Sequence, residues 1–253
     1  MVKKGIPMSQ NLNVVNMLVD DATIANWNNE GLPADDVSIE NGTILTNSER
    51  YPMMIDPQLQ GITWIREKLK NIDYIVLKLS KKTYAFDLER AIEDGQSVII
   101  ENLEEYIDPV LMPVIARNVI KRGNKKYMMF GGKQLDLHPN FRLYMQTKLS
   151  NPNYPPEIQA ESVLINFTVT ELGLGDQLLN FIVGKERPDL ALTKKDLVMQ
   201  QNNYKIQLKR LELDLLNQLN RTTGDATENI VLIESLESSK ILAVEIKEKV
   251  SKA

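Results

Sequence analysis

Short apolar runs alternate with segments of helical periodicity between residues 51 and 175, and this alternation restricts the fold more than any other feature of the chain. The strand-like runs are 51–55, 74–79, 97–100, 127–130, 141–147 and 163–169. Helical spacing is found at 61–70, at 84–93 before Gly95, and at 109–120, where Pro113 must sit early in the helix or kink it. Strands separated by helices predict an α/β fold with a mainly parallel sheet covered by helices on both faces.

The flanking regions have a different texture, which predicts three parts: 1–50, 51–175 and 176–253. Residues 1–50 are polar and rich in turns, with a short amphipathic helix expected from Val14 to Val19 and a helix cap expected at Asp36 or Ser38. Apolar residues after 176 follow heptads, with Leu190, Leu197, Tyr204 and Leu211 spaced by seven. A second heptad segment covers 229–250. We therefore expect a projecting antiparallel helical hairpin.

The turn between the two helices of this hairpin is expected at Arg221, Thr222, Thr223, Gly224 and Asp225.

Composition excludes several classes of site. The 253 residues contain no cysteine and one histidine, His138, so cysteine-ligated zinc, thiolate catalysis and multi-histidine metal sites are excluded. The net charge of −4 gives no basic excess for nucleic acid. No apolar run approaches the ~18 residues of a membrane span, and the N-terminus lacks a signal-peptide core. We expect no metal, nucleic-acid or membrane partner.

The segment that follows the first strand has the context of a phosphate-binding loop, with the pattern G-x-x-x-x-G-K-[ST]. Here Asp56 replaces the first glycine and Ile62 replaces the lysine, whereas Gly61 and Thr63 are retained. Ile62 cannot supply a positive charge to the phosphates. An Asp56 carboxylate ~4 Å from a phosphate would repel it by ~4 kcal/mol at an effective dielectric constant of ~20. The sequence therefore predicts that nucleotide affinity is lost.

Two later strands carry the other parts of such a site. Glu101 and Asn102 follow the run 97–100, in the place of a Walker B motif, but Asn102 cannot act as a base. Thr147 ends a strand where AAA+ proteins carry a polar residue that senses the γ-phosphate. The order of the parts is that of a nucleotide hydrolase, and the catalytic residues are missing, so we expect no catalytic residue and no cofactor.

The chain resembles the fifth AAA+ module of dynein heavy chains, more closely of axonemal than of cytoplasmic ones. One departure is Tyr51-Pro52-Met53, where the family usually has Trp-Pro-Leu. The motifs that carry the resemblance are Trp27-x-x-x-Gly31-Leu32-Pro33, Tyr51-Pro52-Met53-Met54-Ile55-Asp56-Pro57-Gln58, Phe141-Arg142-Leu143-Tyr144, Asn151-Pro152-x-Tyr154, Asn166-Phe167-Thr168-Val169-Thr170 and Glu186-Arg187-Pro188-x-Leu190.

The resemblance implies a P-loop-type three-layer fold and a structural module without nucleotide, set in a six-module ring that hydrolyses ATP elsewhere. The hairpin would be the strut that braces the microtubule-binding stalk, with residues 221–225 at its tip and the module's small lid truncated. Partners would be neighbouring modules and the stalk of the same chain, the microtubule only indirectly, and intermediate and light chains through the parent motor. The location would be cytoplasmic and cytoskeletal, in the axoneme of a cilium or flagellum.

Two other functions remain open from the residues. One is a regulatory module that binds nucleotide without hydrolysing it. The other is a divergent nucleotidase that uses Thr63, Glu101 and a basic residue from elsewhere in the chain. Binding of Mg-ATP to the isolated chain would separate these two functions from the structural one.

Overall fold

The computed structural model describes residues 14–123 and 125–221, together with helical positions between 237 and 246. By their contacts, the residues divide into two compact units, Glu30–Glu171 and the pair of segments Met1–Asn29 and Leu172–Ala253. The contacts place the divisions near residues 29 and 171, and the three parts 1–50, 51–175 and 176–253 stay a prediction. The lead-in expected over 1–50 thus belongs partly to each unit.

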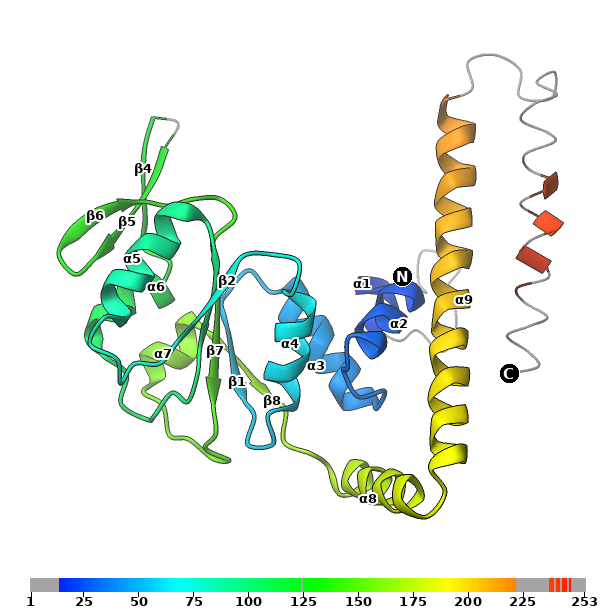
Figure 1. Ribbon diagram of the computed structural model, residues 1–253. Helices are drawn as coiled ribbons and strands as arrows, with labels where there is room; N and C mark the ends of the chain where they lie inside the picture. Colours follow the sequence, from blue (N-terminus) through cyan, green and yellow to red (C-terminus); the bar gives the residue numbers. More distant parts are fainter. Residues whose placement is uncertain are drawn as a thin grey trace, which may run out of the picture. The chain divides into compact units, whose positions relative to one another are not determined.

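A parallel sheet forms the centre of the unit Glu30–Glu171 (Figure 1). Five strands in the order β2-β3-β7-β1-β8 make it, and all of them fall within runs that the sequence predicts as strands. All four residues of β3 are buried, as expected for a strand covered on both faces. The strands are β1 Pro52–Ile55, β2 Tyr74–Leu77, β3 Ser97–Ile100, β7 Arg142–Thr147 and β8 Val163–Asn166.

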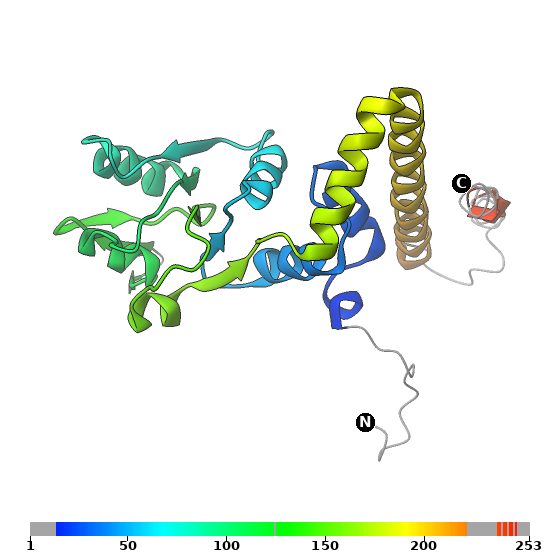
Figure 2. The same cartoon turned by 90° about the horizontal axis from the view of Figure 1, so that it is seen from below.

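Helices cover both faces of this sheet, which confirms the predicted three layers (Figures 1 and 2). One face carries α3 (Asp36–Asn47) and α4 (Gln60–Lys68). The other carries α5 (Tyr84–Asp94), α6 (Met112–Ile115) and α7 (Pro156–Glu161). Right-handed crossovers explain why the helices lie on two faces. The connection β1-α4-β2 runs along the sheet in one direction, and the later connections run in the opposite direction, so α4 lies on one face and α5, α6 and α7 lie on the other.

The prediction of a helix over 109–120 is correct only over 109–115, where Pro113 lies in the first turn of α6 as expected, and it is wrong for the residues that follow. A 3₁₀ turn, η2 (Pro109–Leu111), leads into the short α6, and the chain then extends into β4 (Val119–Arg122). Arg117 has a φ of 52°, which ends the helix just before the β-branched Val119 and Ile120. β4 pairs in antiparallel fashion with β5 (Lys125–Phe130), which pairs with β6 (Lys133–Asp136), so the run expected at 127–130 belongs to a second, three-stranded sheet.

Two helix ends test the expected capping residues. Asp35, and not Asp36 or Ser38, caps α3, because its carboxylate accepts a hydrogen bond from the Ser38 N–H at 3.0 Å. Gly95 ends α5 with a φ of 76°, as the sequence predicts. The ring of the exposed His138 packs directly against Gly95, where any added Cβ would collide with it.

The second unit consists of helices: α1 (Val14–Leu18), α2 (Asp21–Asn29), α8 (Glu171–Glu186) and α9 (Pro188–Arg221). α2 packs along α9, where the buried Asn202 donates to the Asn29 side-chain oxygen at 3.0 Å. The 34 residues of α9 span ~51 Å at ~1.5 Å per residue and confirm a long C-terminal helix. Its expected partner over 229–250 lies largely outside the described residues, as do Thr222 to Asp225.

None of the helices in the described part of the chain is both long and apolar enough to cross a membrane.

Candidate functional site

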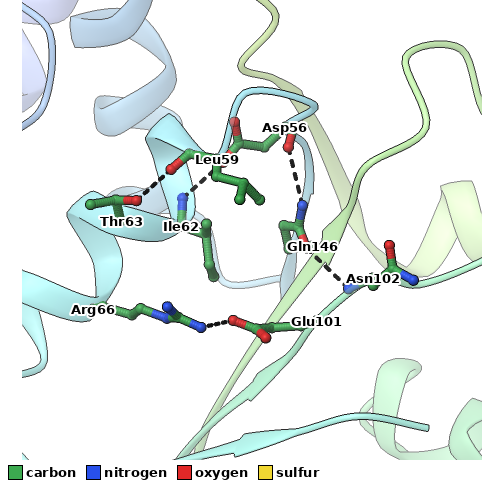
Figure 3. Close-up of polar contacts among 8 residues, drawn as sticks. All are labelled: Asp56, Leu59, Ile62, Thr63, Arg66, Glu101, Asn102 and Gln146. Carbon is green, nitrogen blue, oxygen red and sulfur yellow. Dashed lines mark hydrogen bonds and ion pairs between the residues drawn. The ribbon is translucent and has the colours of Figure 1, made fainter. Parts of the chain in front are cut away.

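The carboxyl ends of β1, β3 and β7 bring together the residues that the sequence singled out, and Figure 3 shows Asp56, Glu101 and Asn102 among them. Asp56 follows β1, Glu101 and Asn102 follow β3, and Thr147 is the last residue of β7. The first turn of α4 supplies Gly61, Ile62 and Thr63. Neighbouring parallel strands end at one edge of the sheet, so the order of the strands alone places these groups side by side.

Asp56 caps the N-terminus of α4 from within the protein. Its side chain is completely buried, and its two carboxylate oxygens accept hydrogen bonds from the N–H groups of Gln60 and Ile62, each at 2.9 Å. A helix N-terminus presents free N–H groups and a partial positive charge, which is how phosphate-binding loops hold phosphate. The carboxylate therefore takes the position that a phosphate oxygen takes in such a loop.

Burial and hydrogen bonding oppose each other at this carboxyl. Burial is the larger influence and raises the pKa of Asp56, whereas the N–H groups of Ile62, Gln60, Gly61 and Leu59 lower the pKa by stabilising the charged form. The negative charge is thus held in place by the helix amides, at a net cost from desolvation.

The retained residues of the loop pattern serve the packing of α4. The Thr63 hydroxyl donates to the Leu59 carbonyl at 2.5 Å, and Leu59 adopts a left-handed φ of 61° at the N-cap position. Gly61 lies against the ring of Phe167, where an added Cβ would come within 2.9 Å of a ring carbon. Ile62, in the place of the lysine, is buried. Each position therefore has an internal contact within the described residues.

Gln146 links the loop to the end of β3, and sequence reasoning missed it. Its side-chain amide donates to the Asp56 carbonyl at 3.1 Å and accepts from the Asn102 N–H at 3.0 Å (Figure 3). Gln146 is buried in a strand that is otherwise mostly apolar. A polar residue in the middle of a buried run was the signal that could have identified it.

The Walker-B-like and sensor-like residues also have partners. The Glu101 carboxylate forms an ion pair with Arg66 of α4, and Asn102 has a left-handed φ of 54°. The buried Thr147 hydroxyl donates to the Leu103 carbonyl at 2.7 Å and accepts from the Leu149 N–H at 3.2 Å. Arg66 is the second residue that the sequence did not indicate.

A hollow of about 450 Å³ lies in the helical unit, and one of about 290 Å³ lies beside Glu101 and Asn102, lined also by Lys78, Ser80, Glu104 and Tyr106. Within the described ranges, no cluster of three or more His, Asp or Glu side chains could hold a metal ion. Of the expected strut-tip residues, Arg221 ends α9, and residues 222–225 lie outside the described part of the chain.

Comparison with known proteins gives a consistent family. Residues 25–246 match the family described as the ATP-binding dynein motor region. The ciliary dynein beta chain of Tripneustes gratilla is 52% identical over 251 residues, and the flagellar outer arm dynein alpha chain of Chlamydomonas reinhardtii is 50% identical over 252 residues. Human dynein axonemal heavy chain 9 is 50% identical over 252 residues.

These matches cover 99%, 99% and 100% of this chain, which spans only 6% of the length of each relative. The matched residues include both the parallel sheet and α9. The chain therefore belongs to the dynein heavy chains, as a part of their AAA motor region.

Proposed function

We propose that this chain is a non-catalytic, structural AAA+ module of an axonemal dynein motor ring, the fifth of the ring's six modules. In this proposal α9 is one half of a strut that braces the microtubule-binding stalk and relays ring movement to it. The single observation that carries the non-catalytic role is the buried Asp56 carboxylate at the N-terminus of α4.

The residues present do not fit a nucleotide phosphate. A phosphate would have to displace a carboxylate that already holds two helix N–H groups at 2.9 Å. It would also meet Ile62 where the phosphate-binding lysine belongs, and a like charge ~4 Å away would add ~4 kcal/mol of repulsion at an effective dielectric constant of ~20. The Glu101–Arg66 pair and the inward-bonded Thr147 support the same conclusion.

The relatives support a place in cilia or flagella, because their printed names are those of ciliary, flagellar outer arm and axonemal chains. In this proposal the partners are the neighbouring modules and the stalk of the same heavy chain. Contact with the microtubule is indirect, and intermediate and light chains bind elsewhere on the motor.

The test is thermal unfolding of the chain with and without millimolar Mg-ATP. A ligand at a hundred times its Kd adds ~2.7 kcal/mol, which shifts the midpoint by several degrees. We expect no shift for the wild type. We expect a shift for the double variant Asp56→Gly/Ile62→Lys, which removes the internal anion and restores the lysine. The matched control is Asp36→Gly/Ile120→Lys, with the same substitutions at exposed positions of the same unit.

A Mg-dependent shift of the wild type without hydrolysis would contradict the proposal and favour a regulatory nucleotide-binding module. A shift accompanied by phosphate release would favour the divergent nucleotidase. Both outcomes are read from the same samples.

A further inference from the structure

A second cleft lies at the opposite, amino-terminal edge of the sheet. It has a volume of about 610 Å³ and is walled by the end of α3, the loop before β1, the last turn of α4, Arg117 after α6 and the start of β7. Four of its side chains are cationic and one is anionic. They are Arg50, Lys68, Arg117 and Arg142, with Glu49 as the single carboxylate.

Among the described residues, the arginines of this cleft form hydrogen bonds with main-chain carbonyls and none with a carboxylate. One terminal nitrogen of Arg117 donates to the Glu49 main-chain carbonyl at 2.5 Å, and one of Arg142 donates to the Phe141 carbonyl at 3.1 Å. Across the ranges that the structure describes, no ion pair involves Arg50, Arg117 or Arg142. This differs from Arg66, which neutralises Glu101 at the other edge.

Arg117 carries a second sign of an incomplete site. Its Nε is buried and has no hydrogen-bond partner among the described residues, although a guanidinium N–H that is removed from water is destabilising if it stays unpaired. Its backbone φ of 52° is left-handed, a conformation that is unfavourable for a residue other than glycine. Arg117, which lines the cleft, is therefore incompletely paired by groups of the protein.

The positive charges act together on the cleft wall. Burial raises the pKa of Tyr51, and the charges of Arg117 and Arg142 both oppose that rise, so both guanidinium groups lie close to the same phenol. The chain as a whole carries a net charge of −4, so this concentration of cations runs against its overall charge. A cleft whose charges are mostly of one sign attracts groups of the opposite charge.

We propose that this cleft binds a carboxylate-rich peptide segment from another part of a dynein heavy chain. The cations come from four separate parts of the chain and surround a space that is also lined by the half-buried Tyr144 and by the edges of the buried Tyr51 and Leu143. A cleft of this size with separated cations suits several carboxylates of one peptide better than a single inorganic anion. This chain spans only 6% of the length of its relative, so most of such a heavy chain lies outside it. The inference rests on the proposed function in one respect, because it takes the peptide segment to come from that remaining part.

The experiment measures binding of a fluorescein-labelled hexaglutamate peptide to the chain by fluorescence anisotropy at low salt, with hexaglutamine as the neutral peptide. We expect hexaglutamate to bind, hexaglutamine not to bind, and Arg142→Gln and Arg117→Gln each to weaken the Kd about tenfold, as the loss of one charged hydrogen-bonding group predicts. The control Arg122→Gln removes the same charge from an exposed position on β4 and should leave the Kd within twofold.

Arg117→Lys is the second variant, for use if Arg117→Gln does not fold. The lysine keeps the positive charge but loses the planar guanidinium, so the Kd for hexaglutamate should still rise. Equal weakening by all three glutamine variants would overturn the proposal in favour of unspecific charge attraction. So would an absence of binding, or displacement of the peptide by millimolar inorganic phosphate that binds with the same dependence on Arg117 and Arg142. None of these outcomes changes the Mg-ATP result that tests the non-catalytic role.

Discussion

At the scale of single residues, Asp56 determines which anion the N-terminus of α4 holds. A glycine at this position leaves the amides of α4 open to an external anion, whereas the aspartate supplies the anion internally. The helix N-terminus is therefore satisfied from within the protein, by a carboxylate that is buried and hydrogen-bonded.

The protonation of Asp56 gives a prediction about pH. The pKa of this carboxyl is raised from 3.8, so the folded state holds its proton at pH values where the unfolded chain has released it. The stability that this proton contributes is fully present below the unfolded value and is lost as the pH rises through the folded value. Asp56→Asn removes the titration, so the wild type should gain stability relative to Asp56→Asn as the pH falls from 7 towards 4.5.

Urea unfolding of both proteins across that range measures this difference. Glu93→Gln, at an exposed position on α5, serves as the control and should follow the wild type more closely. If the unfolding free energies of the wild type and of Asp56→Asn changed with pH by the same amount, the Asp56 carboxyl would not be the cause of the pH dependence.

Gly61 gives the second prediction at this scale. Alanine is ordinarily the better helix former by about 1 kcal/mol, but here its Cβ would lie 2.9 Å from the Phe167 ring. We expect Gly61→Ala to lose about 1–3 kcal/mol of unfolding free energy, as overpacked cores do. A double-mutant cycle with Phe167→Leu measures the clash, and a coupling energy near zero would place the cause elsewhere.

At the scale of elements, the sequence predicted what local patterns encode. The strands of the parallel sheet were found because buried strands in α/β proteins are short and continuously apolar. The sheet β4-β5-β6 was largely missed because only β5 contains an apolar run, at 127–130. The strands β4 and β6 are short and carry exposed charged residues such as Lys121 and Lys133.

The candidate site, like the fold, was predicted where local patterns encode it and missed where distant contacts do. Strand ends are local features, so Asp56, Glu101 and Thr147 were placed together in advance. Gln146 and Arg66 act through partners 90 and 35 residues away, and no local pattern indicates which distant group a side chain will meet.

The glycines of α8 give a prediction for an element. Gly175 and Gly184 are exposed within this helix, and an added Cβ at either would have no atom within 4 Å. Gly→Ala at an open helical site removes backbone entropy from the unfolded chain, so each variant should stabilise the helical unit by about 0.5–1 kcal/mol. Helix content followed by circular dichroism during heating measures this, and a lower midpoint would show that the glycines are needed for a bend or a contact.

At the scale of the whole molecule, the division into two units separates two kinds of stability. The unit Glu30–Glu171 holds its main core around the parallel sheet. The helical unit depends on contacts such as Asn29 with Asn202 and Asp20 with Lys209, and many of its large apolar side chains, including Phe181 and Leu192, are exposed. We therefore expect the helical unit to be the less stable of the two.

This expectation can be tested with a double variant in α9. Leu208 and Leu211 are half-buried. The double variant Leu208→Asp/Leu211→Asp removes two apolar side chains and places two charges in their positions, which should lower the unfolding free energy of the helical unit by several kcal/mol. Hydrogen exchange resolved by segment should then show lost protection in α2 and α9, with β1, β3 and β7 still protected. The control Glu212→Asp/Asp214→Glu alters two exposed positions of the same helix and should leave both units intact. If the sheet lost protection together with α9, the chain would fold as one cooperative body. Two units with separate cores can open independently, so protection of the sheet should not depend on packing in α9.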